Sequence, residues 1–292
     1  MQDLLKKLRK YEIRIRKAIT SHMQGDFHSV FKGSGLEFDD VRPYQYGDDT
    51  RSIDWNVSAK GHGTYIKTFK EEKEQTVFFI LDVSASQEIG TDGRKKLDVG
   101  REICSLLTIS AIKESAQVGL ICYSDQKEAY LKPAKGIRHS YEIINKLFKL
   151  KIESPRTNLK HAIQYALGTI KRKSVIILVS DFIDEDYEHS LTALAKKHDL
   201  VVIHIYDIRE TTLPRLGIVP LYDQESQKTI WVNTSSSPFR KKMERIYGSN
   251  RENLEKFCRR HQANYVSIRT DEDYVPKLIK LFRVRNKTVK VG

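Results

Sequence analysis

From Thr76 onward, short apolar runs alternate with amphipathic stretches of helical period, and this alternation constrains the fold more than any other feature. Residues 77–81 (VFFIL) and 175–179 (VIILV) are apolar at every position, as strands covered on both faces must be. Strands that alternate with helices build a mostly parallel sheet whose two faces are both covered. The pattern therefore predicts an α/β fold.

The same pattern places the individual elements. The link between residues 123 and 129 is too short for a crossover, so the strand after it should lie at an edge and run antiparallel. Residues 211–237 break the pattern and predict an inserted β-hairpin. We expect strands near 76–82, 117–123, 129–132, 174–180, 200–206 and 264–268, and helices near 94–115, 137–149, 158–172, 185–197, 238–262 and 272–284.

The first 75 residues have a different character. Residues 4–19 carry apolar side chains at spacings of three and four and predict an amphipathic helix. Residues 21–75 are rich in Gly, Asp, Arg and aromatic residues and show no sustained period, apart from one strand expected near 65–69. We therefore divide the chain into an N-terminal segment, 1–75, and an α/β domain, 76–292.

Composition bears on the broad function classes. The net charge of +13 is concentrated at the two ends, where basic residues alternate with core-spaced apolar ones; this favours solvated helix faces. A basic nucleic-acid or membrane-surface protein remains an alternative, although no RNP-type strand or zinc finger supports specific nucleic-acid binding.

No apolar run approaches the roughly 20 residues of a transmembrane helix. The isolated cysteines Cys104, Cys122 and Cys258 are expected to be buried free thiols, and a cytoplasmic location is expected.

Oxygen-bearing side chains follow the strands whose carboxyl ends should lie side by side, where open parallel sheets bind ligands. Two carboxylates, three hydroxyls and waters suit Mg²⁺ or Mn²⁺; Ca²⁺ is possible but usually takes more oxygens. The alternative is that the first three side chains only cap the following turn. The candidate metal ligands are Asp82, Ser84, Ser86, Thr157 and Asp181.

These five residues, in this order, resemble the metal-ion-dependent adhesion site (MIDAS) of von Willebrand factor A domains. The resemblance implies a Rossmann-like fold with a mostly parallel six-stranded sheet. It implies that the hydroxyls of Ser84, Ser86 and Thr157 bind the metal and that the two carboxylates bind directly or through water. One coordination position would then be left for an acidic side chain of a protein partner. Arg156 and Phe182 stand where glycine is common in that family.

The motifs between Gly33 and Lys60, including residues 51–55 (RSIDW), resemble a bacterial domain-of-unknown-function family with a von Willebrand-like half. Its members commonly accompany MoxR-type AAA+ ATPases. This resemblance implies an adaptor that works with such an ATPase in chaperone-like roles or in metal-cofactor maturation. The charged residues of these motifs are expected either to bind a ligand or to form a buried ion-pair network beneath Trp55; they are Arg42, Asp48, Asp49, Arg51 and Asp54.

A metal-dependent hydrolase or phosphatase built on the same loops is the enzymatic alternative. Phosphotransferases with an aspartyl nucleophile usually carry a second acid two residues later, and Ser84 stands there. The sequence contains no P-loop, GxSxG elbow or HExxH pair. Four scattered histidines, His62, His161, His189 and His204, read as packed or surface residues. We therefore expect a binding protein and not an enzyme.

Overall fold

The computed structural model describes residues 36–61, 63–71, 75–91, 93–211, 214–223 and 228–289. The helix predicted over residues 4–19, with Gly33 of the N-terminal motif and His62, lies outside these ranges. The described residues fall into two compact units, one ending at Gln75 and the other beginning at Thr76. Among the described helices, none is both long enough and apolar enough to cross a membrane.

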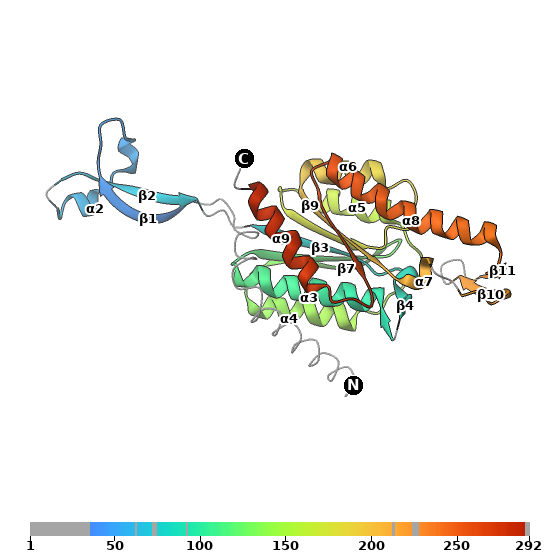
Figure 1. Ribbon diagram of the computed structural model, residues 1–292. Coiled ribbons are helices and arrows are strands. Elements are labelled where there is room, and N and C mark those ends of the chain that lie inside the picture. Colours follow the sequence, from blue (N-terminus) through green and yellow to red (C-terminus); the bar gives the residue numbers. More distant parts are fainter. Residues whose placement is uncertain are drawn as a thin grey trace. The chain divides into compact units, whose positions relative to one another are not determined.

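A six-stranded sheet forms the centre of the larger unit, with strand order β12-β9-β8-β3-β6-β7 (Figure 1). Five strands run parallel, and β7 pairs antiparallel with β6 at one edge. The strands are β3 (Thr76–Asp82), β6 (Gln117–Tyr123), β7 (Lys127–Ala134), β8 (Val175–Ser180), β9 (Asp199–Tyr206) and β12 (Asn264–Arg269). The fold predicted from the resemblance to von Willebrand factor A domains is confirmed.

Helices cover both faces of this sheet (Figure 1). The side chains of Val77 and Phe79 pack with α3, α4 and α9, whereas Phe78 and Ile80 pack with α5, α6 and α8. Successive strand residues face opposite sides, so a strand between two helix layers must be apolar throughout. The helices are α3 (Lys96–Lys113), α4 (Ile137–Lys149), α5 (Leu159–Thr169), α6 (Glu188–Lys197), α8 (Ser237–Arg260) and α9 (Val275–Val289).

Short elements fill the connections at the carboxyl edge of the sheet. A 3₁₀ turn, η2 (Ala85–Glu88), and a small hairpin of β4 (Gly90–Thr91) and β5 (Arg94–Lys95) follow β3. The four-residue helix α7 (Ile208–Thr211) follows β9. None of these was predicted, because two to four residues are too few to show a period.

The insertion predicted over residues 211–237 contains the expected β-hairpin. Its strands are β10 (Ile218–Asp223) and β11 (Lys228–Asn233), which pair antiparallel and form a separate two-stranded sheet. The hairpin lies between α7 and the N-terminus of α8 (Figure 1).

The smaller unit is built on an antiparallel pair, β1 (Leu36–Pro43) and β2 (Tyr65–Glu71), joined through η1 (Thr50–Ser52) and α2 (Trp55–Ser58). The sequence predicted β2 but missed β1, whose two aspartates and terminal proline are disfavoured in strands.

The predicted buried ion-pair network beneath Trp55 is wrong. The Trp55 side chain is 71% exposed, and Asp49 and Asp54 accept backbone hydrogen bonds that cap η1 and α2. Among the described residues, two ion pairs form instead: Arg42 binds Asp48 through two hydrogen bonds, 2.7 and 2.9 Å long, and Lys67 lies 3.7 Å from Asp54. Short acidic side chains before a helical turn satisfy free backbone N–H groups, which explains their spacing without burial.

Gly119 of β6 permits a close approach within the core of the larger unit. A Cβ at this position would lie 2.5 Å from the Phe78 ring. The ring is buried in the layer that packs against α5, α6 and α8, so it has little room to move.

We predict that Gly119→Ala lowers the free energy of unfolding by about 1–3 kcal/mol, because a methyl group here overpacks the core. Urea denaturation of both proteins measures the difference. Gly168→Ala is the matched control: its Cβ would meet nothing within 4 Å, and alanine favours the helix, so it should not destabilise the protein. Equal losses from both substitutions would contradict the packing argument.

Candidate functional site

The candidate site begins where β3 ends, at the carboxyl edge of the sheet. Asp82 is the last residue of β3, and its Oδ1 accepts hydrogen bonds from the backbone N–H of Ser84 at 3.0 Å and from its hydroxyl at 2.7 Å. Ser84 precedes η2 but makes no side-chain cap to it. Turn capping therefore explains only the hydrogen bond from the Ser84 backbone N–H to Asp82. It does not explain the hydroxyls of Ser84 and Ser86.

The second carboxylate oxygen of Asp82 links β3 to β8. Asp82 Oδ2 accepts hydrogen bonds from the hydroxyl of Ser180 at 2.7 Å and from the Gln87 amide at 3.2 Å. Despite these donors, burial and the nearby charge of Asp181 raise the pKa of Asp82 to about 6. Ionised Asp82 is therefore stabilised less by its surroundings than a carboxylate in water.

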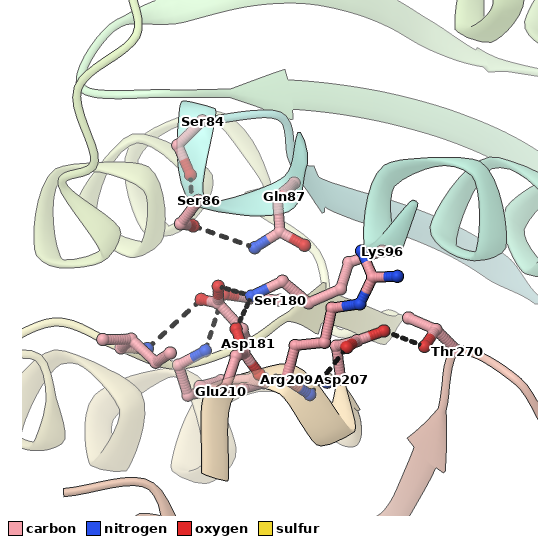
Figure 2. A network of polar contacts seen from close by, with 12 residues as sticks. Ser84, Ser86, Gln87, Lys96, Ser180, Asp181, Asp207, Arg209, Glu210 and Thr270 are labelled. Atoms are coloured by element: carbon pink, nitrogen blue, oxygen red, sulfur yellow. Dashed lines mark hydrogen bonds and ion pairs between the residues drawn. The ribbon is translucent and has the colours of Figure 1, made fainter. Parts of the chain in front are cut away.

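The hydroxyls of Ser84 and Ser86 lie side by side, with their Oγ atoms 3.1 Å apart. The Ser86 hydroxyl also lowers the pKa of the buried Asp181 carboxylate, so Asp181 lies near the same loop. The Gln87 amide approaches Ser86 Oγ at 3.4 Å (Figure 2). Four of the five predicted ligands, from the ends of β3 and β8, are therefore brought together.

The fifth predicted ligand, Thr157, lies on the loop before α5. This loop is tied to the others by its backbone: the carbonyl of Pro155 accepts from the N–H of Ala85 at 2.9 Å, and the N–H of Asn158 donates to the carbonyl of Ser124 at 3.1 Å. Thr157 is half-buried between these two tethers. The structure thus places its loop beside residues 82–86, as the predicted site requires.

A buried lysine, which the sequence analysis did not identify, enters the site from α3. Lys96 Nζ lies 2.6 Å from Asp181 Oδ2 and also forms an ion pair with Glu210 of α7 (Figure 2). Burial disfavours the charged ammonium, but the two carboxylates raise the pKa of Lys96 above its usual value. Burial likewise opposes ionisation of Asp181, yet Lys96 holds the pKa of Asp181 below its ordinary value. Lys96 and Asp181 therefore form a charged pair.

The buried charges do not balance. Asp82, Asp181 and Glu210 are each at most 5% exposed; Lys96 pairs with the last two, whereas Asp82 is surrounded by hydroxyl and amide donors. Burial is the main cause that raises the pKa of Glu210 as well as that of Asp82. Within the described chain, no three His, Cys, Asp or Glu residues are grouped closely enough to hold a metal ion. A cation at this site would therefore depend on the hydroxyls as well as the carboxylates.

One sequence signal does point to Lys96. Lys95 and Lys96 stand at the N-terminus of α3, where the helix dipole disfavours cations. Such residues need acidic partners: Lys95 pairs with Glu88, and Lys96 pairs with Asp181 and Glu210. Glu210 lies 114 positions after Lys96 in the chain. The sequence could therefore indicate that Lys96 needs an acidic partner, but not which residue provides it.

Two other residues of the sequence analysis are explained by their surroundings. Phe182, which stands where glycine is common, adopts a left-handed backbone with φ of 55°. Its ring is buried against Tyr187 and His204, with centroids 6.0 and 6.1 Å away. His204 is itself buried and hydrogen-bonded to the Tyr265 hydroxyl at 3.0 Å, as predicted for a packed histidine. Apolar packing therefore stabilises a loop conformation that otherwise favours glycine.

The topology and the oxygen-rich carboxyl edge define an α/β protein of the von Willebrand factor A type. The family model described as "Protein of unknown function DUF58" matches residues 40–253, and the chain belongs to this family. The predicted membership of a domain-of-unknown-function family is confirmed. The match carries no information on MoxR-type ATPases.

Similar proteins extend over most of the chain. An uncharacterised protein of Mycobacterium tuberculosis is 24% identical over 289 residues, which are 98% of this chain and 90% of that protein. An uncharacterised protein of Mycobacterium avium is 24% identical over 164 residues, 55% of this chain and 96% of that protein. Neither description names an activity.

The chain is also similar to two solved structures. The conserved hypothetical protein BatB from Bacteroides thetaiotaomicron is 14% identical, covers 73% of this chain and 99% of its own, and has a TM-score of 0.46. The VWA domain of SpRpn10 is 14% identical, covers 71% of this chain and 94% of its own, and has a TM-score of 0.39. Likenesses this distant carry no argument about function.

We predict that Lys96→Met lowers the free energy of unfolding by about 3–5 kcal/mol, because it leaves Asp181 and Glu210 buried without their cation. Adding Glu210→Gln should recover part of this loss. Urea denaturation measures each variant. Lys95→Met is the matched control: this neighbouring lysine is 49% exposed, so its loss should cost less than about 1 kcal/mol. A Lys96→Met protein as stable as the control would contradict a structural role for the ammonium.

Proposed function

We propose that this protein is a metal-dependent protein-binding module, in which a divalent cation at the end of β3 captures an acidic side chain of a partner. The observation that carries the proposal is the pair of hydroxyls, Ser84 Oγ and Ser86 Oγ, held 3.1 Å apart between two buried carboxylates. The metal would be Mg²⁺, or else Mn²⁺ or Ca²⁺. Its proposed ligands are Asp82, Ser84, Ser86, Thr157 and Asp181.

The spacing of the hydroxyls supports the proposal. Mg²⁺ takes octahedral ligands at about 2.0–2.1 Å, so neighbouring ligand atoms lie about 2.9–3.0 Å apart. The Oγ atoms of Ser84 and Ser86 are separated by nearly this distance. Both hydroxyls could therefore occupy adjacent positions around one cation with little movement of the loop.

The direction of the hydroxyl protons supports it as well. The Ser84 hydroxyl donates to Asp82, and the Ser86 hydroxyl lies near the Asp181 carboxylate, whose pKa it lowers. A serine whose proton points at a carboxylate keeps its oxygen lone pairs for another partner. The carboxylates would then act mainly by orienting the hydroxyls and supplying charge, and water would complete the coordination.

The uncompensated negative charge gives a reason for a cation. Of the three buried carboxylates, only Asp181 and Glu210 pair with the ammonium of Lys96, and burial raises the pKa of Asp82 to about 6. A buried charge is stabilised only when it is paired or binds a metal. A bound divalent cation would supply the missing positive charge, and the half-buried Ser86 and Thr157 would leave it open to a partner.

Binding without catalysis is part of the proposal. Ser84 occupies the position two residues after Asp82 where phosphotransferases usually carry their second acid. Lys96 engages both Asp181 and Glu210, so neither carboxylate is free to act as a general base. The same residues would therefore hold a cation without supplying a nucleophile and base pair.

The partner in this proposal is a MoxR-type AAA+ ATPase or one of its client proteins in the cytoplasm. It rests on the resemblance of the motifs between Gly33 and Lys60, and it implies chaperone-like work such as metal-cofactor maturation. The partner would present an Asp or Glu side chain to the cation.

We predict that Mg²⁺ and Mn²⁺ raise the melting temperature of the EDTA-treated protein, because a ligand that binds only the folded state stabilises it. Calorimetric titration should show saturable binding. Asp82→Ala and Thr157→Ala should abolish it. Glu142→Ala on α4, which removes an exposed carboxylate away from this loop, should bind as the unaltered protein does. No saturable binding of either ion would contradict the metal site.

We also predict that the purified MoxR-type ATPase from the same cell binds this protein in Mg²⁺. Binding should disappear in EDTA and with Asp82→Ala, while Glu142→Ala retains it. The affinity is measured by immobilising this protein on a surface and titrating the ATPase over it. Equal binding in Mg²⁺ and in EDTA would contradict capture through the metal, even if the two proteins associate.

A further inference from the structure

The hairpin of β10 and β11 carries a surface that the proposed metal site does not use. Its two strands pair only with each other and not with the six-stranded sheet. Its base is fixed, since the hydroxyl and backbone N–H of the buried Thr234 both donate to the carbonyl of Gly217, at 3.1 and 2.9 Å. The hairpin is therefore a ribbon attached at one end.

One face of this ribbon is exposed at every position. Residues paired across an antiparallel ladder point to the same side, and alternate residues along each strand share that side. Three large side chains lie on it: Ile218 is 68% exposed, Tyr222 is 58% exposed and Trp231 is 68% exposed. The face, called here the outer face, contains Ile218, Pro220, Tyr222, Thr229, Trp231 and Asn233, all exposed and none charged.

The opposite face is better covered. Val219, Leu221 and Val232 are half-buried there, although Ile230 is exposed. Monomeric proteins rarely expose a continuous apolar surface of this kind unless it binds something. The outer face is therefore the side of the hairpin available to a partner.

Positively charged residues flank the hairpin along the chain. Residues 214–242 contain five Lys or Arg residues and two acids. Arg215 precedes β10, Lys228 begins β11 on the face opposite the outer face, and Lys241 and Lys242 lie in the first turns of α8; all four are exposed. The hairpin therefore combines uncharged aromatic and aliphatic side chains with a cationic border.

We propose that the outer face inserts into the interfacial region of an anionic lipid bilayer. Trp and Tyr prefer the boundary between headgroups and acyl chains, where an apolar ring and a polar atom are both satisfied. Lysine and arginine near the surface are attracted by anionic lipids. A second copy of this chain fits less well, because two such hairpins would bring their positive borders together. The structure thus assigns a membrane-surface contact that needs no spanning helix.

This contact is independent of the proposed metal site. The site is formed by the loops after β3 and β8 and before α5, whereas the hairpin follows β9 and α7. Failure of metal binding would therefore leave the membrane contact untouched, and the reverse also holds.

Trp231 is the natural probe. The chain has two tryptophans, so Trp55→Phe leaves Trp231 as the only tryptophan. In this background the full chain is mixed with vesicles of phosphatidylcholine alone or of equal parts phosphatidylcholine and phosphatidylglycerol. We expect a blue shift of Trp231 emission and co-sedimentation with the anionic vesicles, and neither effect with phosphatidylcholine alone. The same result is expected in EDTA and with Asp82→Ala.

Two double variants test the contributions of the outer face and of the flanking positive charge. Ile218→Ser/Tyr222→Ser should keep the fold by circular dichroism but lose the blue shift. Lys241→Glu/Lys242→Glu should weaken binding by on the order of tenfold or more. The matched control, Lys146→Glu/Lys149→Glu on exposed positions of α4, changes the net charge equally and should retain most of the binding.

Three outcomes would overturn the proposal. One is no co-sedimentation with anionic vesicles. Another is a sign of general adsorption of a basic protein. Such a sign would be co-sedimentation with unshifted Trp231 emission, or an equal loss of vesicle binding in both charge-reversed variants. The third is a concentration-dependent oligomer, seen by light scattering, that Ile218→Ser/Tyr222→Ser disperses; it would identify a second copy as the occupant.

Discussion

The ammonium of Lys96 holds together three segments that are far apart in the chain. It joins the start of α3 to Asp181 at the end of β8 and to Glu210 in α7. A charge taken out of water is tolerated only when its partners are in place, so the three segments fix one another. Asp181 in turn accepts a hydrogen bond from the backbone N–H of Ile183 at 3.2 Å, and the nearby Ser86 hydroxyl lowers its pKa. The geometry of the oxygen-rich loop thus depends on an ion pair beneath it.

The sheet determines where these segments meet. Successive connections run outward in both directions from β3, so the loops after β3 and β8 lie side by side at the carboxyl edge. The polar side chains at this edge are satisfied mainly by one another, as the bonds from Ser84 and Ser180 to Asp82 illustrate. Negative charge still exceeds positive charge among the buried groups. The proposed cation-binding role rests on this imbalance and on the spacing of two hydroxyls.

The same edge carries two surfaces of different chemistry. The loop after β3 presents hydroxyls and carboxylates, and the hairpin after α7 presents Trp231, Tyr222 and Ile218 with a basic border. Glu210 belongs to α7, the element directly before the hairpin, and contacts Lys96. An adaptor of this kind would hold a protein partner through the cation while its hairpin contacts a lipid surface.

The sequence by itself determined the strands of the six-stranded sheet and the helices that cover it, because their apolar periods are local, and it indicated which loops carry the oxygen-bearing side chains. It did not predict the N-terminal strand β1, because two Asp residues and a Pro obscure the apolar alternation there. Only the tertiary structure decided that Lys96 is buried, that it pairs with Glu210, and that Asp48 rather than a buried network holds Arg42. Periodicity shows which face of an element is apolar. It does not show which distant polar group compensates a buried charge, because that choice depends on how the elements pack.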